Sequence, residues 1–134
     1  MRSLIGVDHI RFPDAIRFYM KEKSLSIREL SEKSECPVHI ITHVLERRFD
    51  GIPYTLPIVL GIGLGLSPEE IYDLLSRACR TIPTFTDPYD LLLREIISRP
   101  YPKTMAECNA LLTGSGFDAL TDFGITVPER LNKY

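Results

Sequence analysis

Apolar residues recur at helical spacing along most of the chain, and prolines, glycines or capping residues separate the apolar stretches. Pro13 is followed by Ile16, Tyr19 and Met20, the spacing of one face of a helix that begins at a proline. No alternating strand pattern competes with this period. The pattern predicts helices at about 13–23, 27–34, 37–47, 55–64, 68–80, 88–99 and 104–112, with a further short helix around 117–121.

Several boundaries have a specific chemical signal. Ser26 followed by Glu29 is a capping box, which predicts the start of the second helix at Ile27. Ser67-Pro68 is an equally strong helix start. Gly61 and Gly63 lie in an almost wholly apolar helix, so close packing against a neighbour is expected to offset their cost of about 1 kcal/mol each.

These signals divide the chain into three parts. Residues 1–12 are expected to form an irregular arm, 13–80 a compact five-helix domain, and 81–134 a helical region that follows a Thr/Pro linker. The predicted fold class is therefore all-α. The carboxyl-terminal region, which is rich in the apolar residues Leu91, Leu92, Ile96, Leu111 and Leu112, is expected to serve dimerisation or partner binding.

The segment from Ser26 to Leu45 resembles the helix-turn-helix of the Xre/Cro-like, phage-repressor family, and the resemblance runs from about Ile16 to Leu74. Its second and third helices are joined by the tight turn Glu35-Cys36-Pro37. The residues that carry it are Leu25-Ser26, Glu29-Leu30, Ser31, Ile41, Val44 and the closing pattern Leu60-Gly61-x-x-Leu64-Gly65-Leu66-Ser67.

The resemblance implies a transcriptional regulator that binds the major groove of double-stranded DNA as a homodimer. The DNA-binding residues it implies are Val38, His39, Thr42, His43, Arg47 and Arg48. His and Thr side chains can hydrogen-bond base edges or phosphates, and Val can contact a thymine methyl group. For Arg47-Arg48, a phosphate contact and a solvated surface pair stay equally open.

Four positions depart from the family pattern. Ile27 stands where Gln is usual, Val38 where a polar or basic residue is usual, Met20 where Arg is usual and Glu35 where Gly is usual. These changes support a second hypothesis, a helix-turn-helix that acts as a protein–protein interaction module through Ile27, Val38 and Ile40.

Charge does not favour nucleic acid. The chain has 16 Lys and Arg against 18 Asp and Glu, and residues 1–80 have 11 of each. A DNA-binding protein usually shows a basic surplus, because phosphate neutralisation provides much of its affinity. DNA binding by this chain would therefore depend on a local patch.

The remaining chemistry is sparse. Cys36, His39 and His43 share a helix side but no fourth ligand completes a zinc site, and no catalytic or phosphate-binding motif is present. We therefore expect no enzyme activity, metal or cofactor. Three scattered cysteines and the absence of a signal peptide or a membrane-spanning run predict a reduced, cytoplasmic protein with no membrane contact.

Overall fold

The computed structural model describes residues 3–46, 53–99 and 104–121. These ranges contain seven α-helices and no strand, so the all-α prediction is confirmed. The helices are α1 (Phe12–Glu22), α2 (Ile27–Ser34), α3 (Val38–Leu45), α4 (Thr55–Gly63), α5 (Pro68–Arg77), α6 (Pro88–Ser98) and α7 (Met105–Gly114). No helix within the described ranges has the length and apolar character that a bilayer crossing requires.

Most helix starts follow their capping signals. Ser26 with Glu29, Ser67 with Glu70, and Thr104 with Glu107 each form a complete capping box, in which side chain and backbone satisfy one another at both residues. Asp87 caps α6 by accepting a hydrogen bond from the Tyr89 N–H.

Helix ends agree less well with the sequence pattern. The third helix ends at Leu45 and the fifth at Arg77, each earlier than predicted. Cys79 adopts φ +56°, a left-handed conformation that cannot continue a helix. The short helix expected at 117–121 is wrong: the side chain of Asn109 accepts a hydrogen bond from the Leu120 N–H at 2.7 Å and donates one to the Thr121 hydroxyl at 3.2 Å. These side-chain contacts take the place of helical backbone bonds.

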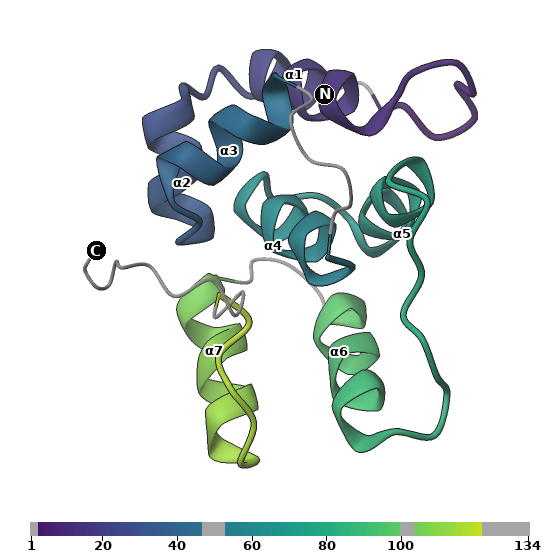
Figure 1. The fold of residues 1–134 in the computed structure, drawn as a ribbon, viewed down its shortest axis with the longest axis vertical. Coiled ribbons are helices and arrows are strands. Elements are labelled where there is room, and N and C mark those ends of the chain that lie inside the picture. The colour runs from purple at the N-terminus through teal and green to yellow at the C-terminus, as the bar shows by residue number, and fades with distance from the viewer. Residues whose placement is uncertain (1–2, 47–52, 100–103, 122–134) are drawn as a thin grey trace.

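The apolar helix α4 lies at the centre and packs against α2, α5 and α7 (Figure 1). Nearly all of its residues are buried. A Cβ atom added to Gly61 would lie 2.8 Å from the Ile71 Cγ1 atom, and one added to Gly63 would lie 2.6 Å from the Ser34 Cβ atom. The close packing predicted for these glycines is therefore present. It brings α5 and the end of α2 directly against α4.

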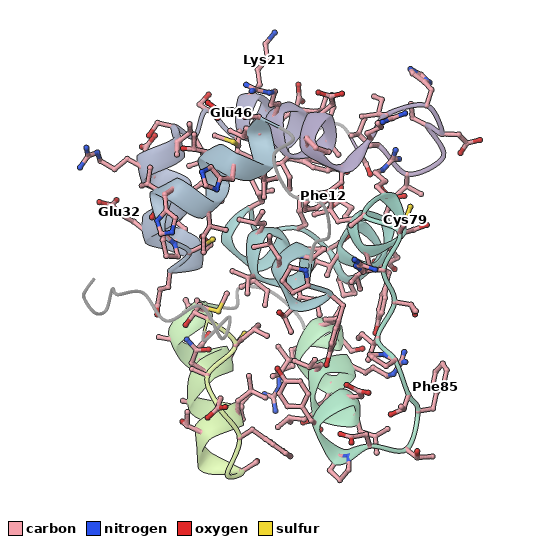
Figure 2. The ribbon with its side chains drawn as sticks, viewed as in Figure 1. Phe12, Lys21, Glu32, Glu46, Cys79 and Phe85 are labelled. Atoms are coloured by element: carbon pink, nitrogen blue, oxygen red, sulfur yellow. The ribbon has the colours of Figure 1, made fainter. Side chains whose placement is uncertain are left out.

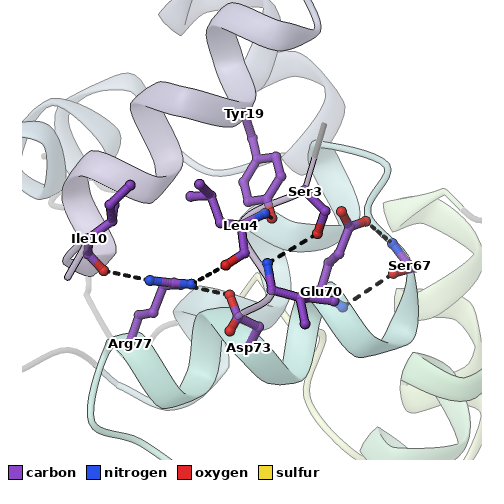
Figure 3. Close-up of polar contacts among 9 residues, drawn as sticks. Ser3, Leu4, Ile10, Tyr19, Ser67, Glu70, Asp73 and Arg77 are labelled. Carbon is purple, nitrogen blue, oxygen red and sulfur yellow. Dashed lines mark hydrogen bonds and ion pairs between the residues drawn. The ribbon is translucent and has the colours of Figure 1, made fainter. Parts of the chain in front are cut away.

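The amino-terminal arm is irregular, as predicted, but it is anchored to the helices (Figure 3). The Arg77 guanidinium donates to the carbonyl oxygens of Leu4 at 2.6 Å and Ile10 at 2.7 Å, and it pairs with Asp73. The Leu4 N–H donates to the Tyr19 hydroxyl at 2.9 Å, and the Leu4 side chain is buried. Residues 3–11 are thus held against α1 and α5.

The carboxyl-terminal helices pack on the preceding ones, α6 on α5 and α7 on α4 (Figure 1). Ile96 and Leu112 are fully buried within the chain, so these two cannot serve the expected intermolecular contact. Leu91 is 47% exposed and Leu92 is partly buried. Only part of the apolar surface of this region is therefore open to a partner.

The buried carboxylate of Asp90 connects α6 to the linker that precedes it and to Tyr54, the residue before α4. Asp90 of α6 is 4% exposed and accepts hydrogen bonds from the Thr84 N–H and hydroxyl, at 3.0 and 2.9 Å, and from the Tyr54 hydroxyl at 3.1 Å. Burial and the neighbouring Asp90 raise the pKa of Tyr54 above its ordinary value, which keeps the phenol protonated as the donor.

Candidate functional site

The turn between α2 and α3 is fixed by two serine hydroxyls. Ser31 donates to the Cys36 carbonyl oxygen at 2.6 Å, and Ser34 donates to the Leu30 carbonyl oxygen at 2.7 Å while accepting from the Cys36 N–H at 3.2 Å. Glu35 has φ +56°, as expected for the position where glycine is usual. Its left-handed backbone costs roughly 1 kcal/mol, and the hydrogen bonds around it hold the turn.

The inner side of α3 is packed against the rest of the unit. Leu30, Ile41 and Val44 are essentially inaccessible to solvent, as predicted for residues that hold the two helices together. Arg17 of α1 donates to the Leu45 carbonyl oxygen at 3.1 Å, which satisfies one of the orphan carbonyls at the end of α3. Thus α1, α2 and the turn together set the orientation of α3.

The predicted DNA-binding side chains on α3 lie on its outward side. We call Val38, His39, Thr42 and His43 the α3 outer face. Val38 is 45% exposed, the two histidines are exposed, and Thr42 is half-buried. The rings of His39 and His43 lie edge to face with centroids 6.2 Å apart. Arg47 and Arg48, the other two predicted contacts, lie outside the described residues.

Three exposed glutamates, which we call the acidic rim, lie on the elements that adjoin this face. Glu32 lies on α2 and Glu46 follows the last residue of α3 (both labelled in Figure 2), and Glu35 lies in the turn; all three are exposed. From Ser26 to Glu46 the sequence holds four glutamates against one Arg and one Lys, a net charge of −2 when the histidines are neutral. Such a rim repels phosphate groups, so any attraction to DNA requires cations from elsewhere in the chain.

The Cys36, His39 and His43 side chains do not converge. Cys36 is fully buried, and this burial raises the pKa of its thiol to about 12, whereas both histidines are exposed. In the described part of the chain, no three His, Cys, Asp or Glu side chains gather in a way that could hold a metal ion. Cys36 fills the apolar interior of the turn, as its position in the sequence predicts.

The alternative interaction surface requires a correction. Ile40 is only 3% exposed, because it points into the core beside Ile41, and Ile27 is partly buried. Of the three residues expected in that patch, Val38 alone is well exposed. The helix pattern did not separate Ile40 from Val38, because both lie in an apolar run on a short helix that is covered on more than one side.

Sequence reasoning missed several residues that position this face. The serine hydroxyl contacts of the turn and the Arg17 contact with α3 join different elements, whereas only capping signals are visible in the local sequence. Comparison with protein-family models, with curated proteins and with solved structures found no match to this chain.

Proposed function

We propose that this chain is a sequence-specific DNA-binding transcriptional regulator of the Xre/Cro-like kind that acts as a dimer, with the α3 outer face reading the major groove. The observation that supports this proposal is the open outward side of α3, next to a tight turn and on a helix whose inner side is packed. A helix presented in this way has the geometry by which helix-turn-helix proteins enter the major groove.

In this proposal His39, Thr42 and His43 hydrogen-bond base edges or phosphates, and Val38 contacts a thymine methyl group. Arg47 and Arg48 follow Glu46, the residue after α3, and would supply phosphate contacts. Pairing of two chains doubles the phosphate contacts, which matters here because each chain has a net charge of −2.

The test is fluorescence anisotropy on DNA fragments from upstream of the protein's own gene, at several salt concentrations. The double substitution Arg47→Ala/Arg48→Ala is expected to weaken binding to all sequences and to reduce the salt slope by about 0.9 for each lost phosphate contact. Thr42→Val is expected to alter sequence preference instead. Arg99→Ala, which removes an exposed arginine of the α6 end, is the matched control. DNA binding that is unaffected by salt concentration and by the loss of both arginines would contradict the proposal.

A second candidate function, a protein-interaction module, is favoured by one specific observation. The exposed Val38 belongs to the segment from Ser26 to Glu46, in which four glutamates outnumber one Arg and one Lys. An apolar centre with an acidic rim is complementary to a partner with a basic rim.

Neutralising the rim separates the two functions. The triple substitution Glu32→Gln/Glu35→Gln/Glu46→Gln is expected to strengthen DNA binding several-fold, because it removes repulsion from the phosphates. For a basic protein partner the same change would weaken binding instead. Stronger DNA binding by the triple variant therefore supports the regulator proposal. A triple variant that still does not bind DNA counts against it.

A further inference from the structure

A pocket of about 270 Å³ lies between α5, the linker 81–87 and α6. None of its lining residues belongs to the α3 outer face. Its volume is just below the range of about 300–1,000 Å³ that is typical of small-molecule sites, so it suits a small ligand. Its lining combines cations, hydroxyl groups and apolar side chains.

The guanidinium of Arg94, which lines this pocket, is held without a carboxylate partner. Its Nη2 atom donates to the carbonyl oxygens of Ile82 at 3.2 Å and Thr84 at 3.0 Å. The Phe85 ring lies over the guanidinium carbon at 3.8 Å, although Phe85 itself is 76% exposed. Two carbonyls and a cation–π contact thus fix the orientation of a positive charge that no described carboxylate neutralises.

The other two nitrogens of the Arg94 guanidinium, Nε and Nη1, can still donate hydrogen bonds. Nε is buried and has no hydrogen-bond acceptor, which normally costs free energy in a folded protein. Nη1 has no acceptor in the described chain either, and it is not buried. An oriented guanidinium with an open edge is suited to a carboxylate or phosphate group.

The rest of the lining has the same preference. Arg80 provides a second cation, and Tyr72, Ser76 and Thr81 provide hydroxyl groups; no acidic side chain lines the pocket. Of the carboxylates on the adjoining helices, Asp73 pairs with Arg77 and Asp90 accepts from Thr84. Leu75 and Ile82 supply an apolar part.

We propose that this pocket binds a small organic anion, with its phosphate or carboxylate group at Arg80 and Arg94 and its carbon skeleton against Leu75 and Ile82. The site joins the last helix of the five-helix unit to the linker and α6. A ligand there would contact both parts of the chain, which gives the protein an effector site separate from α3. The inference stands independently of whether α3 binds DNA.

The test is an amide NMR titration of the full chain with four probes at matched ionic strength: inorganic phosphate, phenyl phosphate, acetate and benzoate. Shifts are expected at Thr81, Ile82 and the Arg94 side chain. Phenyl phosphate should bind more tightly than inorganic phosphate, or benzoate more tightly than acetate. Comparison of the phosphate pair with the carboxylate pair identifies the preferred anionic group.

Arg94→Gln and Arg80→Gln are each expected to weaken binding by about tenfold, the usual effect of losing a charge-assisted hydrogen bond. Arg99→Gln, which removes the same charge from the exposed pair with Glu95, should bind as the parent does. If Arg94→Gln fails to fold, the exposed Arg80 decides the question. Absence of shifts at tens of millimolar for all four probes, or unchanged binding by folded Arg80→Gln, would overturn the proposal.

Discussion

The five helices α1–α5 and the pair α6–α7 are held in different ways. In the first group, apolar faces meet directly: the Ile71 side chain packs onto Gly61, and the Ser34 backbone lies against Gly63. In the second, α6 and α7 pack mainly on α5 and α4, and an edge-to-face contact between Tyr89 and Phe117, with centroids 5.3 Å apart, connects the two parts of the region. The carboxyl-terminal helices therefore depend on the amino-terminal unit for burial more than the unit depends on them.

The largest effect that tests this contrast is expected at Gly63. Gly63→Ala would place a Cβ atom 2.6 Å from the Ser34 Cβ atom and 2.9 Å from its Cα atom, and backbone cannot move aside as a flexible side chain can. Overpacking of this kind costs about 3 kcal/mol. Urea denaturation of the full chain measures the loss.

Gly114→Ala is the control from the other region. Nothing lies within 4 Å of the added Cβ atom, and the position is at the end of α7, so a small gain in stability is expected. Equal losses at the two glycines would contradict the contrast between the regions.

The next effect is expected at Arg77. Arg77→Met removes the bonds to the Leu4 and Ile10 carbonyl oxygens and leaves both without this donor, at a cost of about 2 kcal/mol. The arm should then exchange its amide hydrogens faster and be cleaved more readily by proteases. Arg99→Met, at an exposed i,i+4 pair, should change the free energy of unfolding by less than about 0.5 kcal/mol. An arm that stays protected in the Arg77 variant would show that Leu4 burial alone holds it.

A smaller and more local effect is expected at Asp90. In Asp90→Asn one carboxylate oxygen becomes an amide nitrogen, so the bonds from Thr84 and Tyr54 cannot all be accepted and about 1–2 kcal/mol is lost. Hydrogen exchange should increase in the linker and α6 and much less in α2 and α3. Asp87→Asn is the matched control, because Asn caps a helix as well as Asp does. Uniform exchange across the chain would indicate that the two regions unfold as one.

The smallest effect is a pH dependence at Glu29. Hydrogen bonds from the Ser26 backbone and side chain lower the pKa of Glu29 below its ordinary value of 4.5. A lowered folded-state pKa gives stability that is present above about pH 4.5 and is lost as the pH falls through the folded value. Glu29→Gln should therefore flatten the pH dependence of the free energy of unfolding between about pH 5 and 3. Glu32→Gln, at an exposed residue of the same helix, is the control; an identical curve from both variants would remove the role assigned to Glu29.

The sequence alone predicted those features that depend on residues close together in the chain. Ser26 with Glu29 and Ser67 with Pro68 placed two helix starts correctly, and the periodicity placed the buried side of α3 at Ile41 and Val44. The end of α5 was harder, because Cys79 adopts a left-handed conformation there without being glycine. At the candidate site, the exposure of Val38, His39 and His43 followed from helix geometry, since residues at i, i+1 and i+5 of this short helix share its outer side.

Long-range polar contacts were beyond local patterns. The role of Arg77 depends on two carbonyl oxygens about seventy residues earlier in the chain, and that of Asp90 on Tyr54. The sequence around Arg77 or Asp90 does not indicate which distant residue each side chain contacts. The burial of Ile40 likewise depends on which elements cover α3, and a helix of eight residues gives too few turns to show it.

The contact between Gly63 and Ser34 has a consequence for recognition. Because the end of α2 touches α4 at backbone distance, the turn that carries α3 has little freedom to tilt. Whatever meets α3 therefore encounters a surface already in its bound shape, and little conformational entropy is lost on the protein side. Any bending or repacking needed for a fit would fall on the partner, which makes the deformability of the target, rather than of this protein, a source of selectivity.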